Sequence, residues 1–185
     1  MKKTLLLLLL LPFCFAAAAE GAIDRAWVER NYRKTEYRIP MRDGVRLHTT
    51  VYAPCDTAGR HPILLTRTPY SCRPYGAEFS ASLWKSFLKL YLEEGYILVF
   101  QDVRGRYMSE GEYVDKHSPE QIDEASDAYD TIDFLVREVA GNNGRVGVYG
   151  NSYPGFYALM AAASGHPALK AASPQAPVTD WFMGD

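Results

Sequence analysis

A serine lies inside a short segment flanked by glycines, GNSYPG at residues 150–155. The residues before it (145–149) are typical of a buried strand, and the small residues of 154–164 are typical of a helix. A serine in a tight turn from strand to helix projects its hydroxyl at the carboxyl edge of the sheet, where open sheets bind ligands. Ser152 is therefore a candidate nucleophile for acyl transfer. The alternative is a structural turn that happens to contain serine, which the position between strand and helix disfavours.

The same turn offers a donor for the negative charge that develops on a carbonyl oxygen during acyl transfer. The backbone N–H of Tyr153 follows the serine directly, and the positive end of the next helix faces the same point. Pro154 makes the spacing G-x-S-x-x-G rather than G-x-S-x-G, and the first turn of a helix tolerates proline. We expect Gly150 to let the strand and the helix approach each other closely.

Strands and helices alternate along the chain and predict the sheet that would position this turn. Two strand-like runs, 35–40 and 45–53, flank an Asp43-Gly44 turn and predict a β-hairpin. The periodicity predicts further strands at 63–68, 96–100, 145–149 and 169–173, and helices at 82–94, 121–139 and 154–164. This order predicts an α/β fold with a mostly parallel sheet and an N-terminal β-hairpin.

The start of the chain has the three-part layout of a secretory signal peptide. A positive start precedes an unbroken apolar run at 5–11, and small residues precede Glu20. Cleavage near Ala19 would export the protein to the periplasm or the medium. An exported protein could join Cys55 to Cys72, but a single pair of cysteines is a weak signal, and the sequence favours two separate thiols. We divide the chain into a signal peptide (1–19), an N-terminal arm (20–34) and a domain (35–185).

The composition is that of a globular protein with a small negative charge. The formal net charge is −2, hydrophobic residues make up 48%, and the basic residues are dispersed among carboxylates. This distribution excludes a nucleic-acid-binding protein. After the signal peptide, no segment approaches the roughly 20 apolar residues of a membrane span. We expect no cofactor and no metal, and the sequence leaves the oligomeric state open.

Several separated motifs give the chain a resemblance to a known family. The motifs are LTRTPY at 65–70, FQDVRGR at 100–106, SEG at 109–111 and GRVG at 144–147, together with Ser152-Tyr153 and residues 177–185. From residue 35 onward, the chain resembles the serine hydrolases that include Xaa-Pro dipeptidyl-peptidases, cocaine esterase, α-amino acid ester hydrolases and glutaryl-cephalosporin acylases. The resemblance implies an α/β-hydrolase core that cleaves ester or amide acyl bonds with a Ser-His-Asp triad.

The resemblance also implies roles for individual residues. Ser152 matches the nucleophile, and Tyr70 matches a tyrosine whose hydroxyl completes an oxyanion hole with the backbone N–H of Tyr153. A phenol is a suitable donor because it is neutral and protonated at pH 7. Without the resemblance, Tyr70 would be interpreted as a loop aromatic that packs on the core.

Two groups of charged residues receive a structural interpretation. Asp102 and Arg104 of the FQDVRGR motif are placed to brace their loop with an ion pair. Four aspartates recur along the predicted helix 121–139, and we expect them to form a solvated face opposite its apolar stripe. These aspartates are Asp123, Asp127, Asp130 and Asp133.

The described motifs contain a nucleophile and an oxyanion hole but no catalytic base. In α/β-hydrolases the acid and the base follow the serine in the chain. The only histidine after Ser152 is His166, at the far end of the predicted helix and roughly 20 Å away. We therefore expect an amino-terminal piece of a longer hydrolase, truncated before the last strands of its core. A cap, the remaining core and a β-sandwich domain would follow Asp185, and the piece alone would be inactive.

The main functional hypothesis is a serine hydrolase of the esterase or acylase type that forms an acyl-enzyme on Ser152. Its substrate would be a small-molecule or peptide acyl compound. An Xaa-Pro dipeptidyl-peptidase is the alternative within the same class. A hydrolase-like binding module without catalytic activity is the alternative of another class. The sequence does not choose between an ester, a β-lactam side chain and a peptide as the substrate.

Overall fold

Six strands form one mixed sheet in the computed structural model, which describes residues 22–56, 58–114 and 122–179. Their order across the sheet is β1-β2-β4-β3-β5-β6. The pairs β1–β2 and β2–β4 are antiparallel, whereas β4, β3, β5 and β6 are parallel to one another. The predicted, mostly parallel sheet with an N-terminal hairpin is confirmed. The strands are β1 (Tyr32–Pro40), β2 (Arg46–Pro54), β3 (His61–Thr68), β4 (Ile97–Asp102), β5 (Asn142–Asn151) and β6 (Leu169–Gln175).

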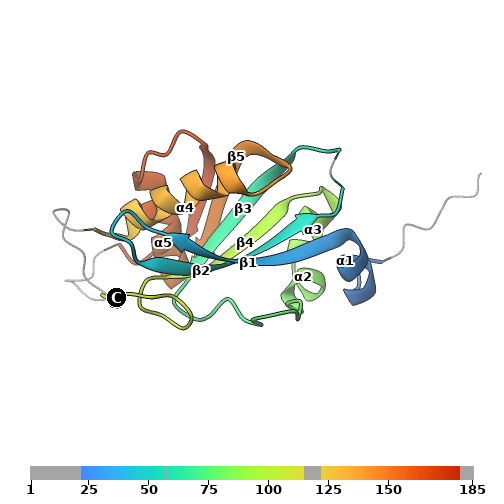
Figure 1. Ribbon diagram of the computed structural model, residues 1–185, viewed down its shortest axis with the longest axis horizontal. Helices are drawn as coiled ribbons and strands as arrows, with labels where there is room; N and C mark the ends of the chain where they lie inside the picture. Colours follow the sequence, from blue (N-terminus) through green and yellow to red (C-terminus); the bar gives the residue numbers. More distant parts are fainter. Residues whose placement is uncertain (1–21, 57, 115–121, 180–185) are drawn as a thin grey trace, which may run out of the picture.

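Helices cover both faces of the sheet. Successive residues of a strand face opposite sides, so Leu65 packs against α4 and α5 whereas Leu64 packs against α1, α2 and α3. Figure 1 shows α1–α3 grouped together, away from α4 and α5. The helices of the described residues are α1 (Arg25–Asn31), α2 (Ser82–Lys85), α3 (Leu88–Glu93), α4 (Glu124–Glu138) and α5 (Tyr153–Ala163).

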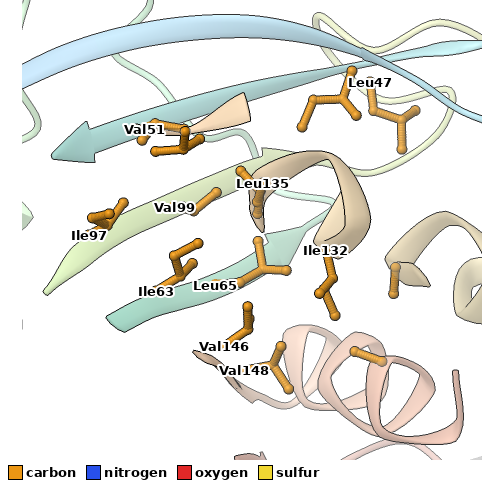
Figure 2. Packing of buried hydrophobic residues seen from close by; sticks show 14 of the residues in the cluster. Leu47, Val51, Ile63, Leu65, Ile97, Val99, Ile132, Leu135, Val146 and Val148 are labelled. Atoms are coloured by element: carbon orange, nitrogen blue, oxygen red, sulfur yellow. The ribbon is translucent and has the colours of Figure 1, made fainter. Parts of the chain in front are cut away.

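The larger hydrophobic core lies between the sheet and the helices α4 and α5. Figure 2 shows Ile132 and Leu135 of α4 beside the valine, leucine and isoleucine side chains of the central strands. The buried residues of α5 include the small Ala158 and Ala161, which let this helix lie close to the sheet. This packing holds the amino end of α5 at the carboxyl end of β5.

The N-terminal arm contains regular structure that the sequence analysis did not predict. Asp24 caps α1 by accepting a hydrogen bond from the Trp27 N–H, and β1 begins at Tyr32 rather than at residue 35. A helix of seven residues is too short to show a clear hydrophobic period.

The predicted helix 82–94 is wrong as a single element, because it is divided at Ser86. The Ser86 backbone is extended, and its hydroxyl donates to the Ser82 carbonyl and accepts from the Leu88 N–H at the start of α3. Serine competes with helical hydrogen bonds in this way. As a result, Phe87 and Leu90 are exposed, although their spacing predicts an inner face.

The predicted solvated face of aspartates is wrong for Asp127, which is buried on α4. Its carboxylate accepts hydrogen bonds of 2.6 and 2.9 Å from the Arg104 guanidinium. Asp123 caps the helix, and Asp130 binds Arg42. The spacing of residues along one helix does not reveal which arginines from other segments, here Arg42 and Arg104, will pair with its aspartates.

The signal peptide at 1–19, His117, Asp180 and Asp185 lie outside the described residues. Cys55 is exposed and Cys72 is buried, and both are free thiols, so the structure favours two separate cysteines over a disulfide. Burial raises the pKa of the Cys72 thiol to about 12. In the three described stretches, no helix combines the length and the apolar character that crossing a membrane requires.

Candidate active site

Ser152 joins β5 to α5 in a strained backbone conformation, with φ 59° and ψ −122°. A positive φ is costly for a residue with a side chain, so surrounding contacts must hold it. The Ser152 N–H donates to the Gln175 carbonyl over 2.9 Å, and the Phe156 N–H donates to the Ser152 carbonyl over 3.1 Å. The serine is exposed to solvent. The strained strand-to-helix turn is therefore present, while the role of Ser152 as nucleophile stays a prediction.

Two glycines of the GNSYPG segment allow the close approach of three elements. A Cβ atom on Gly150 would lie 2.0 Å from the Pro154 carbonyl oxygen of α5. A Cβ atom on Gly155 would lie 2.4 Å from the Gln175 carbonyl oxygen of β6. Any side chain at either position would push α5 away from the strand ends, which confirms the predicted close approach at Gly150.

Tyr153 is the first residue of α5 and is held by aromatic neighbours. Its hydroxyl forms a short hydrogen bond with the Tyr113 hydroxyl, and its ring stacks on Tyr157 at 5.3 Å between centroids. The backbone of Tyr153 thus sits at the positive end of the helix, next to Ser152. Tyr113 could not be found from the sequence, because its loop is separated from Tyr153 by 40 residues.

Tyr70 lies beside the serine turn. It follows β3 by two residues, and β3 is the parallel neighbour of β5, so both residues lie at the same edge of the sheet. The Tyr70 ring contacts the Tyr153 ring edge-on at 6.2 Å. The Tyr70 N–H donates to the Thr68 hydroxyl, and 61% of the residue is exposed. Its exposure argues against the alternative of a core-packing aromatic, and its oxyanion role stays a prediction.

The predicted ion pair between Asp102 and Arg104 is not what the structure contains. Arg104 binds Asp43 and Asp127 instead. Asp102, at the end of β4, is fully buried and accepts hydrogen bonds from the loop that follows Tyr70. Asp102 is the last residue of β4 and Arg104 lies in the turn that follows, so their side chains need not point the same way.

A buried charge cluster lies on the α4 side of β3, and the sequence analysis did not find it. Arg67 and Glu124 are 2.9 Å apart, and each is at most 3% exposed. Among the described residues, neither Arg67 Nη2 nor Glu124 Oε2 has a hydrogen-bond partner of good geometry. Burial raises the pKa of Glu124 to about 7; the Arg67 guanidinium opposes this effect and the Asp127 carboxylate adds to it.

A cavity of about 330 Å³ opens next to the serine turn, on the side of the sheet that faces α2. Pro154 of the GNSYPG segment lines it, and so does Ser71 of the loop that joins β3 to α2 (residues 69–81), which we call the Tyr70 loop. Most of its polar side chains are hydroxyls: Thr66, Thr68, Ser71, Ser80 and Ser82. The cavity therefore lies beside the serine turn and has a hydroxyl-rich wall.

The three described histidines lie away from Ser152. His166 follows α5 at its opposite end, about 16 Å along an eleven-residue helix. His61 begins β3, at the other edge of the sheet. His48 lies on β2, three strands from β5 and therefore roughly 14 Å away. Burial lowers the pKa of His48, which contacts Tyr75 and lies 3.9 Å from the Glu36 carboxylate.

The site combines hydroxyl groups with the amino end of a helix. Within residues 22–56, 58–114 and 122–179, no group of three or more His, Cys, Asp or Glu side chains could hold a metal ion. What the edge of the sheet brings together is an exposed serine, the first N–H of a helix and an exposed phenol.

Comparisons with known proteins agree with this arrangement. A family model described as X-Pro dipeptidyl-peptidase (S15 family) matches residues 43–185. The cocaine esterase of Rhodococcus sp. (strain MB1 Bresler) is 38% identical over 159 residues, covering 84% of this chain and 25% of the esterase. The chain spans about a quarter of the length of the curated relatives it matches.

Two solved structures are similar at comparable sequence identity. An α-amino acid ester hydrolase is 42% identical, with a TM-score of 0.74 over 94% of this chain and 30% of that one. An aminopeptidase from a marine sediment archaeon, Thaumarchaeota archaeon, is 41% identical, with a TM-score of 0.74 over 84% of this chain and 27% of that one.

Proposed function

The chain belongs to the X-Pro dipeptidyl-peptidase (S15) family, and we propose that the whole protein is a serine hydrolase that cleaves ester or amide acyl bonds. The sheet and its helices are those of an α/β-hydrolase. The observation that carries the proposal is the strained, exposed Ser152 at the β5–α5 junction, with Tyr70 beside it.

The geometry supports a two-step reaction. The Ser152 hydroxyl oxygen attacks the substrate carbonyl, and the negative oxygen that results accepts hydrogen bonds from the Tyr153 N–H and the Tyr70 hydroxyl. The leaving group departs with a proton, and the acyl group remains on Ser152 until water hydrolyses it. Each donor of this kind is worth roughly 10²–10³ in kcat.

A base must take the proton of the Ser152 hydroxyl, and the described histidines lie too far from it. Hydrogen-bond reach is about 3 Å, whereas His48 and His166 lie several times farther away. The matched segment covers only 25% of the cocaine esterase. We propose that the base and its acidic partner lie outside the residues that the structure describes.

The substrate class follows from the relatives. An ester or acylase substrate is favoured because relatives at 38–42% identity include a cocaine esterase and an α-amino acid ester hydrolase. The family model and the archaeal aminopeptidase favour a dipeptidyl-peptidase as the second candidate. We propose export as the location, since the first residues resemble a signal peptide.

Fluorophosphonate labelling of the whole protein tests the nucleophile. We expect the wild type to be labelled and Ser152→Ala to lose labelling, because the probe reacts with the activated serine. Ser164→Ala is the matched control, since this serine lies at the other end of α5 and donates to the Ala161 carbonyl. Equal labelling of the wild type and Ser152→Ala would reject the proposal.

A substrate pair separates the two candidate activities. We expect hydrolysis of a p-nitrophenyl ester to exceed hydrolysis of a Gly-Pro p-nitroanilide in kcat/KM, with both lost in Ser152→Ala. The reverse preference would assign the protein to the dipeptidyl-peptidases. Absence of both activities and of labelling would favour a binding module.

A further inference from the structure

Tyr70 is largely exposed, so few packing contacts fix the direction of its hydroxyl. The loop that carries Tyr70 must therefore be held in place by other bonds. The carboxyl ends of β4, β3 and β5 lie side by side, with Thr68 of β3 paired to Asp102 of β4. Asp102 is therefore the neighbour of the Tyr70 loop on one side, and Ser152 is its neighbour on the other.

The buried Asp102 carboxylate binds this loop at two points. Its Oδ1 accepts from the Cys72 N–H over 2.7 Å, and its Oδ2 accepts from the Tyr75 hydroxyl over 2.8 Å. The Met108 N–H reaches Oδ2 over 3.3 Å. Asp102 is 0% exposed, so these bonds lie in a site that excludes water and are costly to leave unmade.

The loop needs such support because its backbone is strained directly after Tyr70. Ser71 has a φ of 85°, which a residue with a side chain rarely adopts. The Ser71 hydroxyl donates to the Tyr75 hydroxyl, which donates to Asp102, so the strained residue is tied to the carboxylate.

The far end of the loop has an anchor of its own. Lys34 of β1 donates to the Pro74, Gly76 and Glu78 carbonyls, each over 2.7 Å. This anchor lies beyond residue 73. Nearer to Tyr70, its own N–H donates to the Thr68 hydroxyl and Arg106 donates to the Pro69 carbonyl, while Asp102 holds the segment after Tyr70 through the Cys72 N–H.

We propose that Asp102 is the positioning residue of the oxyanion hole: by binding the Cys72 N–H and the Tyr75 hydroxyl, it holds the Tyr70 hydroxyl where the oxyanion forms. The inference rests on the proposed serine hydrolase function. Asp102 does not touch the substrate and acts only through Tyr70. Misplacing a catalytic group by about 1 Å can cost roughly 10²-fold in rate.

An Asp102→Asn substitution disturbs this arrangement with little change of shape. The amide has one oxygen and one NH2 group. Whichever way it faces, either the Cys72 N–H or the Met108 N–H points at a donor. Tyr75→Phe is the milder second variant, because it removes only the phenol from the network.

Steady-state kinetics of the whole protein on a p-nitrophenyl ester, corrected for the folded fraction, test the proposal. We expect Tyr70→Phe to lower kcat by roughly 10²–10³. Asp102→Asn should lower kcat by about tenfold or more, Tyr75→Phe should lower it less, and KM should change little for both. The double variant Tyr70→Phe/Asp102→Asn should be no slower than Tyr70→Phe alone, because Asp102 acts only through that hydroxyl.

Asp130→Asn is the matched control. Its carboxylate also binds a backbone N–H, that of Arg42, but far from the serine turn, and kcat should not change. If the losses of Tyr70→Phe and Asp102→Asn multiply in the double variant, or if Asp102→Asn lowers only the melting temperature, the positioning role is wrong. If Asp102→Asn does not fold, the kcat values of Tyr75→Phe and of Tyr70→Phe/Tyr75→Phe are compared with that of Tyr70→Phe in the same way. If Tyr70→Phe itself keeps full kcat, the oxyanion role of Tyr70 in the proposed function fails instead.

Discussion

Ser152 holds its positive φ because β5, α5 and β6 meet at the GNSYPG segment. The Gln175 carbonyl of β6 accepts its N–H, and Gly150 and Gly155 leave room for the backbones of α5 and β6. Backbone strain of this kind costs about 1–3 kcal/mol and persists only where its surroundings enforce it. The glycines are therefore as necessary to the site as the serine.

A Gly150→Ala substitution tests this at the residue scale. The added Cβ would lie 2.0 Å from the Pro154 carbonyl, so α5 must shift, and we expect the free energy of unfolding to fall by about 1–3 kcal/mol or more. Urea denaturation measures the change. Gly147→Ala on the same strand is the control: its Cβ meets nothing closer than 3.6 Å, and we expect less than about 1 kcal/mol. Equal losses would contradict the close-approach argument.

The helix α4 and the strand β3 are joined by buried charges as well as by apolar packing. Glu124 begins the helix, and Arg67 lies near the end of the strand, where it also donates to the Glu124 carbonyl and to Gln101. Burying an incompletely bonded ion pair is costly. Because burial favours the protonated form of Glu124, the free energy of unfolding depends on pH through this residue.

The pH dependence has a definite sign. The pKa of Glu124 rises from 4.5 to about 7 on folding, so the folded state binds its proton more tightly than the unfolded state. This contribution to stability is present below about pH 4.5 and is lost as the pH rises through about 7, with a slope of at most about 1.4 kcal/mol per pH unit.

Glu124→Gln removes this titration. We expect the unfolding free energy of the wild type, relative to that of Glu124→Gln, to fall between pH 4.5 and pH 7 and to level off above. Denaturant melts at several pH values measure it. Glu138→Gln, at an exposed position of the same helix, is the control and should run parallel to the wild type. A constant difference between wild type and Glu124→Gln would show that Glu124 does not titrate in this range.

Elements were predictable where local pattern decides them. The Asp43-Gly44 turn predicted the hairpin, and Gly44 indeed has a φ of 86°. The apolar strands and the GNSYPG turn predicted the parallel part of the sheet. The division at Ser86 was not predictable, since one hydroxyl overrides an apolar period. The partners of Asp102 were not predictable either, because Cys72 and Tyr75 lie about 30 residues earlier in the chain and only the fold brings them together.

At the scale of the described molecule, the edge of the sheet formed by β6 is poorly covered. In the described part of the chain, β6 pairs only with β5, and most of its residues are exposed. A groove of about 390 Å³ runs along β5 and β6 on the face shared with α3, lined by Phe87, Tyr91 and Tyr96 among others. An unpaired strand edge beside an apolar groove favours association.

We therefore expect residues 20–185 alone to self-associate. Size-exclusion chromatography over a range of concentrations should show species larger than a monomer. Ala172→Lys places a charge on the exposed edge strand and should shift the distribution toward the monomer. A monomer with one cooperative melt would contradict this expectation.

The acceptor that holds the serine belongs to this same edge strand. Edge strands with few buried side chains open by local unfolding far more often than a core does. In the described residues, fraying of the end of β6 would take the Gln175 carbonyl away from the Ser152 N–H and let the backbone relax from its positive φ. We therefore expect a strand that pairs with the exposed edge of β6 to hold the serine in its strained conformation, so that docking at this edge would support the nucleophile from a distance.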